Sequence, residues 1–254
     1  MLRIFKAKPV VSTQMGQQIL TIFQEMFTQF GARVFTNNTQ LVLPNDQFFP
    51  SQAGSLTQLA QQSFEQVKAH AQLSQWPIDF SLTRQPQLTT LPVLSFNEQM
   101  YGPDCHIATD YSALNRIKLS GNIEDFSNPQ TAISHIIMQL SSIVLHYSVQ
   151  EQAQDIIRIE LLASFFGFGV MLANTTYQFR GGCGSCYNPR ANRQHGLTEE
   201  EMVYALAIFV GLKEIRNQAV LPALKSYLRP VFKRARKQLE TDSQYLALVS
   251  RLKG

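Results

Sequence analysis

The clearest spacing for chemistry lies in residues 130–149, where a histidine and a glutamine stand four positions apart. His135 and Gln139 share one face of the helix that the apolar periodicity predicts, because residues i and i+4 are neighbours on a helix surface. Zinc peptidases use this spacing for two imidazole ligands, with a glutamate directly after the first histidine as general base. Here the five residues read HIIMQ. Taken alone, this pattern favours His135 as a hydrogen-bonded core histidine.

A second candidate is the motif CGSC, formed by Cys183 to Cys186, with His195 nine residues further on. Two thiolates and one imidazole are ligands of a tetrahedral zinc site, and Cys105 or His106 would be the distant fourth. The sequence has no second CxxC, which a zinc ribbon would show. The motif also lies between two predicted helices, whereas thioredoxin-like redox motifs lie at a strand-to-helix junction. An ordinary cysteine-bearing loop is favoured over a structural metal or regulatory thiols.

The third candidate is a cluster of lysine and arginine in residues 225–237. From Arg216 to the end there are nine Lys or Arg and two acidic residues, a net of +7, so residues 1–215 sum to −3 within a total of +4. Leu228 and Phe232 lie on the opposite side, which predicts an amphipathic helix. A solvated face is the simpler interpretation; the alternatives are binding of nucleic acid, an anionic membrane surface or an acidic partner. The candidate binding residues are Lys225, Arg229, Lys233, Arg234, Arg236 and Lys237.

Helical periodicity accounts for most of the chain that must position these residues. Helices are predicted over residues 12–31, 55–73, 130–149, 152–176, 198–214 and 219–250, the last with a kink at Pro230. Thr198 and Glu201 form a capping box at the start of one of them. Between residues 78 and 120 the short runs DFSLTR, TTLPVLSF, CHIATDY and RIKLS predict a sheet. The expected fold is one α+β domain over residues 1–254, with a small sheet, helical layers and a helical C-terminal half.

The composition favours a folded cytoplasmic protein. Of the 254 residues, 44% are hydrophobic and 16% are charged, against about 25% charged in an average soluble domain. Three cysteines cannot form a disulfide framework, and charged residues interrupt the apolar residues at the N-terminus, so no secretory signal is predicted. The longest uncharged apolar stretch, residues 161–173, is shorter than the roughly 18 residues that cross a bilayer. It is predicted to be a buried helix, and no transmembrane segment is expected.

Residues 157–179, IRIELLASFFGFGVMLANTTYQF, resemble a segment of a little-characterised bacterial family of zinc-dependent peptidases. In that family the segment follows an HExxH helix and carries an acidic third metal ligand. The resemblance extends to LPNDQFFPSQAGSLTQLAQQSFEQV (43–67), RIKLSGNIEDFSNPQTAISHIIMQLSSIVL (116–145) and GLTEEEMVYALAIF (196–209). It covers about residues 40–215 and implies a zincin-like core over that range.

Carried over residue by residue, the resemblance assigns His135 to the first ligand and Glu160 to the acidic third ligand. Ile136 occupies the position of the general base, and Gln139 occupies the position of the second histidine. An isoleucine cannot accept a proton from water, and a neutral amide is a poor zinc ligand. The resemblance therefore implies the scaffold without the activity, with no catalytic residue and no cofactor expected.

The expected function is that of a non-catalytic pseudo-peptidase, a cytoplasmic module that interacts with another protein or a peptide. Two alternatives stay open. One is a divergent metal-dependent hydrolase that uses His135, Glu160 and unrecognised ligands, with zinc as its cofactor. The other is a protein that binds nucleic acid or an acidic partner through the basic helix.

Overall fold

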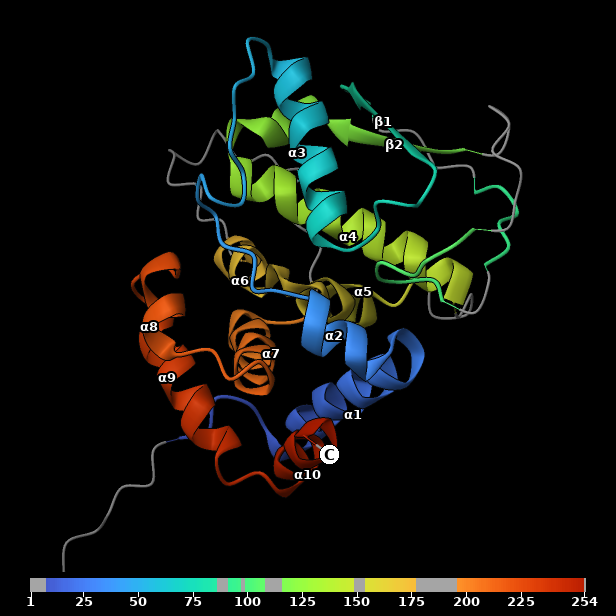
Figure 1. Cartoon of the computed structure of the whole chain (residues 1–254). Coiled ribbons are helices and arrows are strands. Elements are labelled where there is room, and N and C mark those ends of the chain that lie inside the picture. Colours follow the sequence, from blue (N-terminus) through green and yellow to red (C-terminus); the bar gives the residue numbers. More distant parts are fainter. Residues whose placement is uncertain are drawn as a thin grey trace, which may run out of the picture.

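Helices dominate the structure, a computed structural model that describes residues 8–85, 91–96, 99–107, 116–148, 154–176 and 196–253. A two-stranded sheet and α3 lie on one side of α4, and the remaining helices lie on the other side (Figure 1). A single cluster of buried side chains extends from Val11 to Leu248. The predicted α+β class is confirmed.

The described residues form α-helices, two 3-10 helices and one π-helical turn. They are α1 (Thr13–Phe30), α2 (Ala32–Asn38), α3 (Leu56–His70), the 3-10 helix η2 (Ile123–Ser127), α4 (Pro129–Ser148), α5 (Ile156–Ala163), the π-helical turn η4 (Ser164–Phe168), α6 (Gly169–Thr176), α7 (Glu199–Leu212), α8 (Asn217–Val220), the 3-10 helix η6 (Leu221–Ala223), α9 (Leu228–Leu239) and α10 (Ser243–Lys253).

The helix starts are fixed by side chains that accept hydrogen bonds from otherwise unpaired amides. Ser12 caps α1 and Ser55 caps α3. Asn128 accepts a hydrogen bond from the amide of Gln130 at the start of α4. The predicted capping box of α7 is confirmed, with Thr198 and Glu201 each accepting a hydrogen bond from the other's backbone amide.

The sheet is smaller than the sequence predicted. β1 (Ile78–Thr83) pairs in parallel with β2 (Ile117–Asn122), and the register runs from Ile78 opposite Ile117 to Thr83 opposite Asn122. The expected strands near residues 89–96 and 105–111 are wrong where the structure describes them, because that part of the chain holds only the isolated antiparallel bridge between Phe96 and Ile107. α3 covers the sheet, and Phe64 stacks on Phe80 with the ring centroids 4.7 Å apart.

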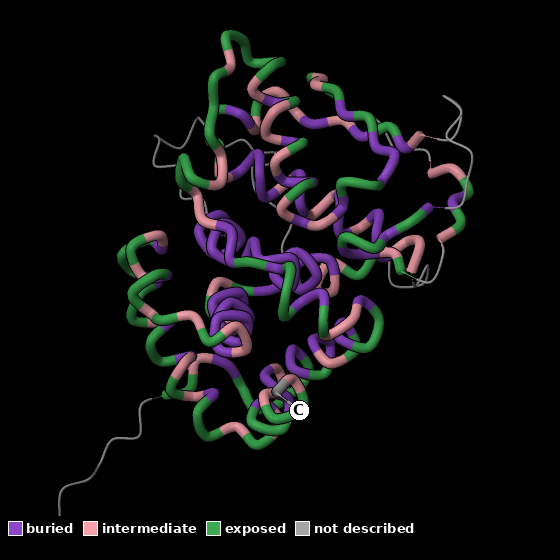
Figure 2. Tube along the Cα trace, viewed as in Figure 1, coloured by how far each residue is buried: buried purple, intermediate pink, exposed green. Residues whose placement is uncertain are grey.

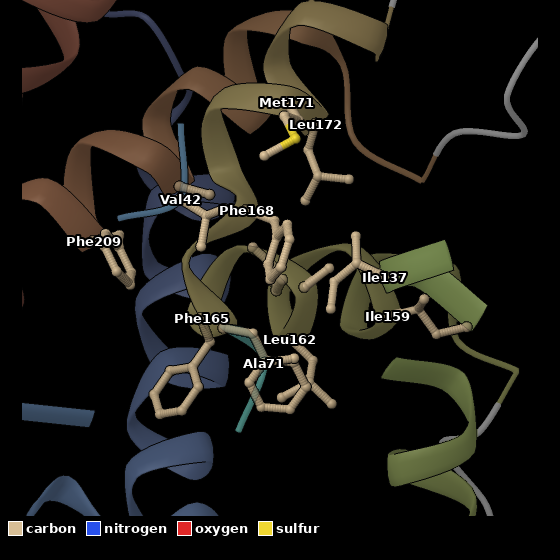
Figure 3. Close-up of a cluster of buried hydrophobic side chains, with 14 of the residues drawn as sticks. Val42, Ala71, Ile137, Ile159, Leu162, Phe165, Phe168, Met171, Leu172 and Phe209 are labelled. Atoms are coloured by element: carbon tan, nitrogen blue, oxygen red, sulfur yellow. The ribbon is translucent and has the colours of Figure 1, made fainter. Parts of the chain in front are cut away.

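The core is built around the apolar helix that α5, η4 and α6 form together. α6 is buried along its whole length, and α5 and α7 are mostly buried beyond their first three residues (Figure 2). The ring centroid of Phe165 lies 5.3 Å from that of Phe27 and 4.9 Å from that of Phe35. Phe168 and Leu162 lie toward Ile137 of α4 (Figure 3). One helix, Ile156–Thr176, is long and apolar enough to cross a membrane, but 83% of its most apolar window is buried inside the fold. The prediction that this stretch is a buried helix is confirmed.

Gly167 interrupts this helix, because its φ of +99° lies in the region that favours glycine. The extended segment after α2 passes directly over it. The Gly167 carbonyl accepts a hydrogen bond of 3.0 Å from the amide of Val42, and a Cβ at Gly167 would overlap the carbonyl oxygen of Gln40. The sequence FFGFG is thus explained by a crossing of two backbones in the core.

The C-terminal region corrects one prediction. Residues 219–250 do not form a single helix; α8, η6, α9 and α10 divide the region. Pro230 causes no kink, because it lies in the first turn of α9, where its missing amide hydrogen costs nothing. α9 packs against α7, and its apolar side is buried as predicted, through Leu228, Phe232, Ala235 and Leu239.

Asn174 of α6 joins three elements and is 4% exposed. Its Nδ2 donates to Gln130 Oε1 of α4 at 2.9 Å and to the carbonyl of Ala223 at 2.9 Å, and its Oδ1 accepts from the amide of Lys225 at 3.0 Å. The amide therefore holds the segment before α9 against the core.

Candidate functional site

His135 lies on a half-buried face of α4 and is paired with a carboxylate that the sequence motifs do not include. Its Nδ1 is 2.7 Å from Asp125 Oδ2, and the two side chains are 28% and 20% exposed. Asp125 belongs to η2, the short 3-10 helix between β2 and α4. A carboxylate in this position fixes the ring and its tautomer, as carboxylates do for histidines in metal and catalytic sites.

Ile136 and Gln139, which the resemblance aligns with the general base and the second histidine, both have structural roles. Ile136 is 1% exposed and belongs to the hydrophobic core. Gln139 Nε2 donates to the carbonyl of Ser120 in β2 at 3.2 Å, which ties α4 to the sheet. Neither position offers a base or an imidazole, as the residue types already indicated.

Glu160 of α5 is fully buried and faces another segment of the protein. Its Oε2 accepts hydrogen bonds from the amides of Leu197 at 2.8 Å and of Gly196 at 3.2 Å. These amides immediately precede α7. Charged acceptors make strong hydrogen bonds, so the carboxylate anchors the start of α7 to α5.

The hydrogen bonds described for His135, Gln139 and Glu160 therefore reach three different segments: η2, β2 and the entry to α7. Within the described ranges, no group of three His, Cys, Asp or Glu side chains could hold a metal ion. His135 is paired with Asp125, and Glu160 accepts hydrogen bonds from the amides of Gly196 and Leu197. What it shows at this site is a histidine–carboxylate pair.

The CGSC candidate falls where the structure makes no statement, because Cys183, Cys186 and His195 lie outside the described residues. Cys105, considered as a distant ligand, is fully buried in the core. Burial raises the pKa of its thiol, which a hydrogen bond to Trp76 partly offsets. Such a thiol is a packing residue rather than a reactive one.

The basic candidates separate into two groups. Arg229 donates to the carbonyls of Leu224 and Pro222, and half-buried Arg236 donates to the carbonyl of Ala207 in α7. These two arginines help to fix α9 in place. The other four, Lys225, Lys233, Arg234 and Lys237, are exposed. Within the described part of the chain, no salt bridge is found for the three of these that lie on α9.

Asp125 and Asn174 are the polar residues that sequence patterns did not reveal. Asp125 follows Glu124 in a short segment without helical periodicity, and its partner comes from the next helix. Asn174 resembles any asparagine near a helix end. In both cases the role is set by a tertiary contact, so residue spacing carried no signal for it.

Comparison of the chain with protein-family models, with curated proteins and with solved structures found no match.

Proposed function

We propose that this protein is a non-catalytic, cytoplasmic interaction protein that retains a zincin-like scaffold without the chemistry of a peptidase. Support comes from the two altered motif positions, since Ile136 is part of the core and the amide of Gln139 is bonded to β2. A site that generates a metal-bound hydroxide needs three protein ligands and a base. Glu160, the expected third ligand, directs its Oε2 to backbone amides.

A divergent metal-dependent hydrolase is the second candidate, and one observation favours it. The contact between Asp125 and His135 is of the kind that orients metal-binding imidazoles. Zinc analysis of the purified protein and of His135→Ala separates the two candidates. Stoichiometric zinc that disappears in His135→Ala would support the hydrolase, and zinc below a tenth of an equivalent in both proteins would support the interaction protein.

The binding face that we propose for this interaction is the exposed side of α9. The single observation that carries it is that Lys233, Arg234 and Lys237 are exposed, with no acidic partner among the described side chains. Leu228, Phe232 and Leu239 are at most 1% exposed on the opposite side. Because the core already holds the apolar side, α9 cannot insert that side into a bilayer as an amphipathic membrane helix does. The face is suited to a polyanion, either nucleic acid or an acidic protein segment.

Reversing two of these charges should abolish the interaction and leave the fold intact. We expect the double variant Lys233→Glu with Lys237→Glu to lose salt-sensitive retention on heparin. Each lysine that contacts a sulfate or phosphate releases counterions, and this release drives the binding, so fewer lysines mean weaker binding. The melting temperature should stay within about 3 °C, since exposed charges contribute little to stability. The measurement is the sodium chloride concentration at elution, followed by binding to a nucleic-acid duplex and to polyglutamate to identify the class of partner.

The matched control is Arg33→Glu with Lys118→Glu, which changes the net charge equally at two exposed positions on α2 and β2. The control should elute close to the wild type. If both double variants lose retention equally, net charge rather than the α9 face governs binding. If the wild type elutes with a neutral protein, the face is only solvated.

A further inference from the structure

A cavity of about 380 Å³ lies where the loop before α3, α3 itself and the first turns of α4 meet. The loop runs beside the start of α4 in Figure 1. The volume of the cavity falls in the range of small-ligand sites, about 300 to 1,000 Å³. The cavity shares no residue with the His135 pair or with α9, so a ligand bound in it would not depend on the proposed function.

One part of the lining is apolar and well anchored. Ile133 of α4 is 4% exposed, and Phe49 and Leu59 are half-buried beside it. Half-buried apolar side chains around a cavity gain free energy when a ligand removes their remaining surface from water. The floor of the cavity therefore suits one aliphatic or aromatic side chain.

A second part of the lining offers hydrogen-bond donors. The side-chain oxygens of Asn45, Asn128 and Gln130 accept hydrogen bonds within the protein, from the amides of Gln47 and Phe48, from the amide of Gln130, and from Asn174 Nδ2, respectively. Their amino groups make no further hydrogen bond to the described residues. An amide whose oxygen already accepts a hydrogen bond within the protein still has its amino group to donate to a ligand.

A third part offers hydrogen-bond acceptors. Gln62 and Gln66 of α3 both donate their Nε2 to the carbonyl of Pro50, at 2.9 and 2.7 Å. Their oxygens make no hydrogen bond to the described residues and are left for a ligand. Asp46 is the single charged side chain in the described lining, so the cavity does not suit an anion.

We propose that this cavity binds a short stretch of peptide in which backbone amide groups flank one apolar side chain. Neutral donors and neutral acceptors around an apolar floor match a peptide backbone, which presents both carbonyl and N–H groups beside its side chain. The amino groups of Asn128 and Gln130 contact the peptide carbonyls, the oxygens of Gln62 and Gln66 accept from its amides, and Ile133 packs against its side chain.

The probe is acetyl-Ala-Leu-Ala-amide, compared with acetyl-Ala-Gly-Ala-amide by NMR titration of the labelled full chain. We expect the leucine peptide to bind at least about tenfold more tightly, because burying a leucine side chain in an apolar site contributes a factor of that order or more. Cyclohexanol serves as a third probe without a peptide group and should bind more weakly than the leucine peptide.

The decisive variant is Asn128→Asp with Gln130→Glu. Each new carboxylate keeps the acceptor oxygen that caps α4 or receives Asn174 Nδ2, and each removes the amino group to which we assign the contact with the peptide. We expect the leucine peptide to bind at least about fivefold more weakly, since each lost hydrogen bond to a buried ligand group weakens binding by such a factor. The control is Asn122→Asp with Gln58→Glu, two amides outside the cavity whose oxygens also accept backbone amides.

Binding of the leucine peptide that weakens in the cavity variant alone supports the proposal. The proposal is overturned by no binding to the wild type, by equal binding of the leucine and glycine peptides, or by equal losses in the two double variants. Tighter binding of cyclohexanol than of the leucine peptide would also overturn it. The retention of every variant on heparin is measured in parallel, so that a failure here is distinguished from a failure at α9.

Discussion

Replacing Gly167 by alanine is expected to destabilise the protein by about 2 to 5 kcal/mol. A non-glycine residue in the left-handed region costs roughly 1 to 2 kcal/mol, and Gly167 has a φ of +99°. The added methyl group would also overlap the carbonyl oxygen of Gln40, and overpacking a core costs typically about 1 to 3 kcal/mol. The two backbone segments cannot easily move apart to make room for the methyl group, because the amide of Val42 donates a hydrogen bond to the Gly167 carbonyl. Chemical denaturation of the wild type and the variant measures the difference.

Gly169→Ala is the matched control in the same buried helix. Gly169 has an ordinary helical φ of −56°, and its Cβ would lie 3.0 Å from Leu206 Cδ1 and 3.0 Å from Ser164 Oγ, both of which are side-chain ends that can move. Alanine also has the better helix propensity, so the loss should be smaller than at Gly167. Equal losses at the two positions would show that local volume, rather than the backbone crossing, dominates.

The elements that the sequence predicted well are those with local signals. Apolar periodicity and a capping serine or threonine lie within one helix, so α1, α3 and α7 were found with bounds close to those observed. The burial of Leu228 and Phe232 on α9 was also predicted, because the helical period decides which side chains of an amphipathic helix face the core.

The features that the sequence could not predict depend on contacts between distant segments. The break between α8 and α9 is held by Asn174, about fifty residues earlier, and the parallel pairing of β1 with β2 joins strands more than thirty residues apart. The carboxylate of Glu160 is bonded to amides at residues 196 and 197. In each case the sequence shows the residue but not its distant partner, which is why the contact between His135 and Asp125 was not predicted.

Ile136→Glu tests whether position 136 of α4 belongs to the hydrophobic core. Ile136 is 1% exposed, so a glutamate there loses the packing of a large apolar side chain and brings a carboxylate into the core. We expect a loss of stability on the order of 4 kcal/mol or more, measured by chemical denaturation. Met138→Glu is the control, since Met138 lies on the same helix but is half-buried, and its loss should be much smaller.

The zinc dependence of a second variant completes the test. Ile136→Glu with Gln139→His restores the full HExxH pattern on a helix where Asp125 already orients His135. A metal that binds only the folded state raises the free energy of unfolding. Once the metal concentration exceeds the dissociation constant, this increase grows with the logarithm of the metal concentration. We expect no such rise, because Oε2 of Glu160, the residue that the resemblance assigns to the third ligand, already accepts hydrogen bonds from the amides of Gly196 and Leu197. A zinc-dependent increase in melting temperature of more than about 5 °C in this variant, absent from Ile136→Glu alone, would show that the fold supplies a third ligand to the two histidines. That result would favour the metal-dependent hydrolase over the proposed interaction protein.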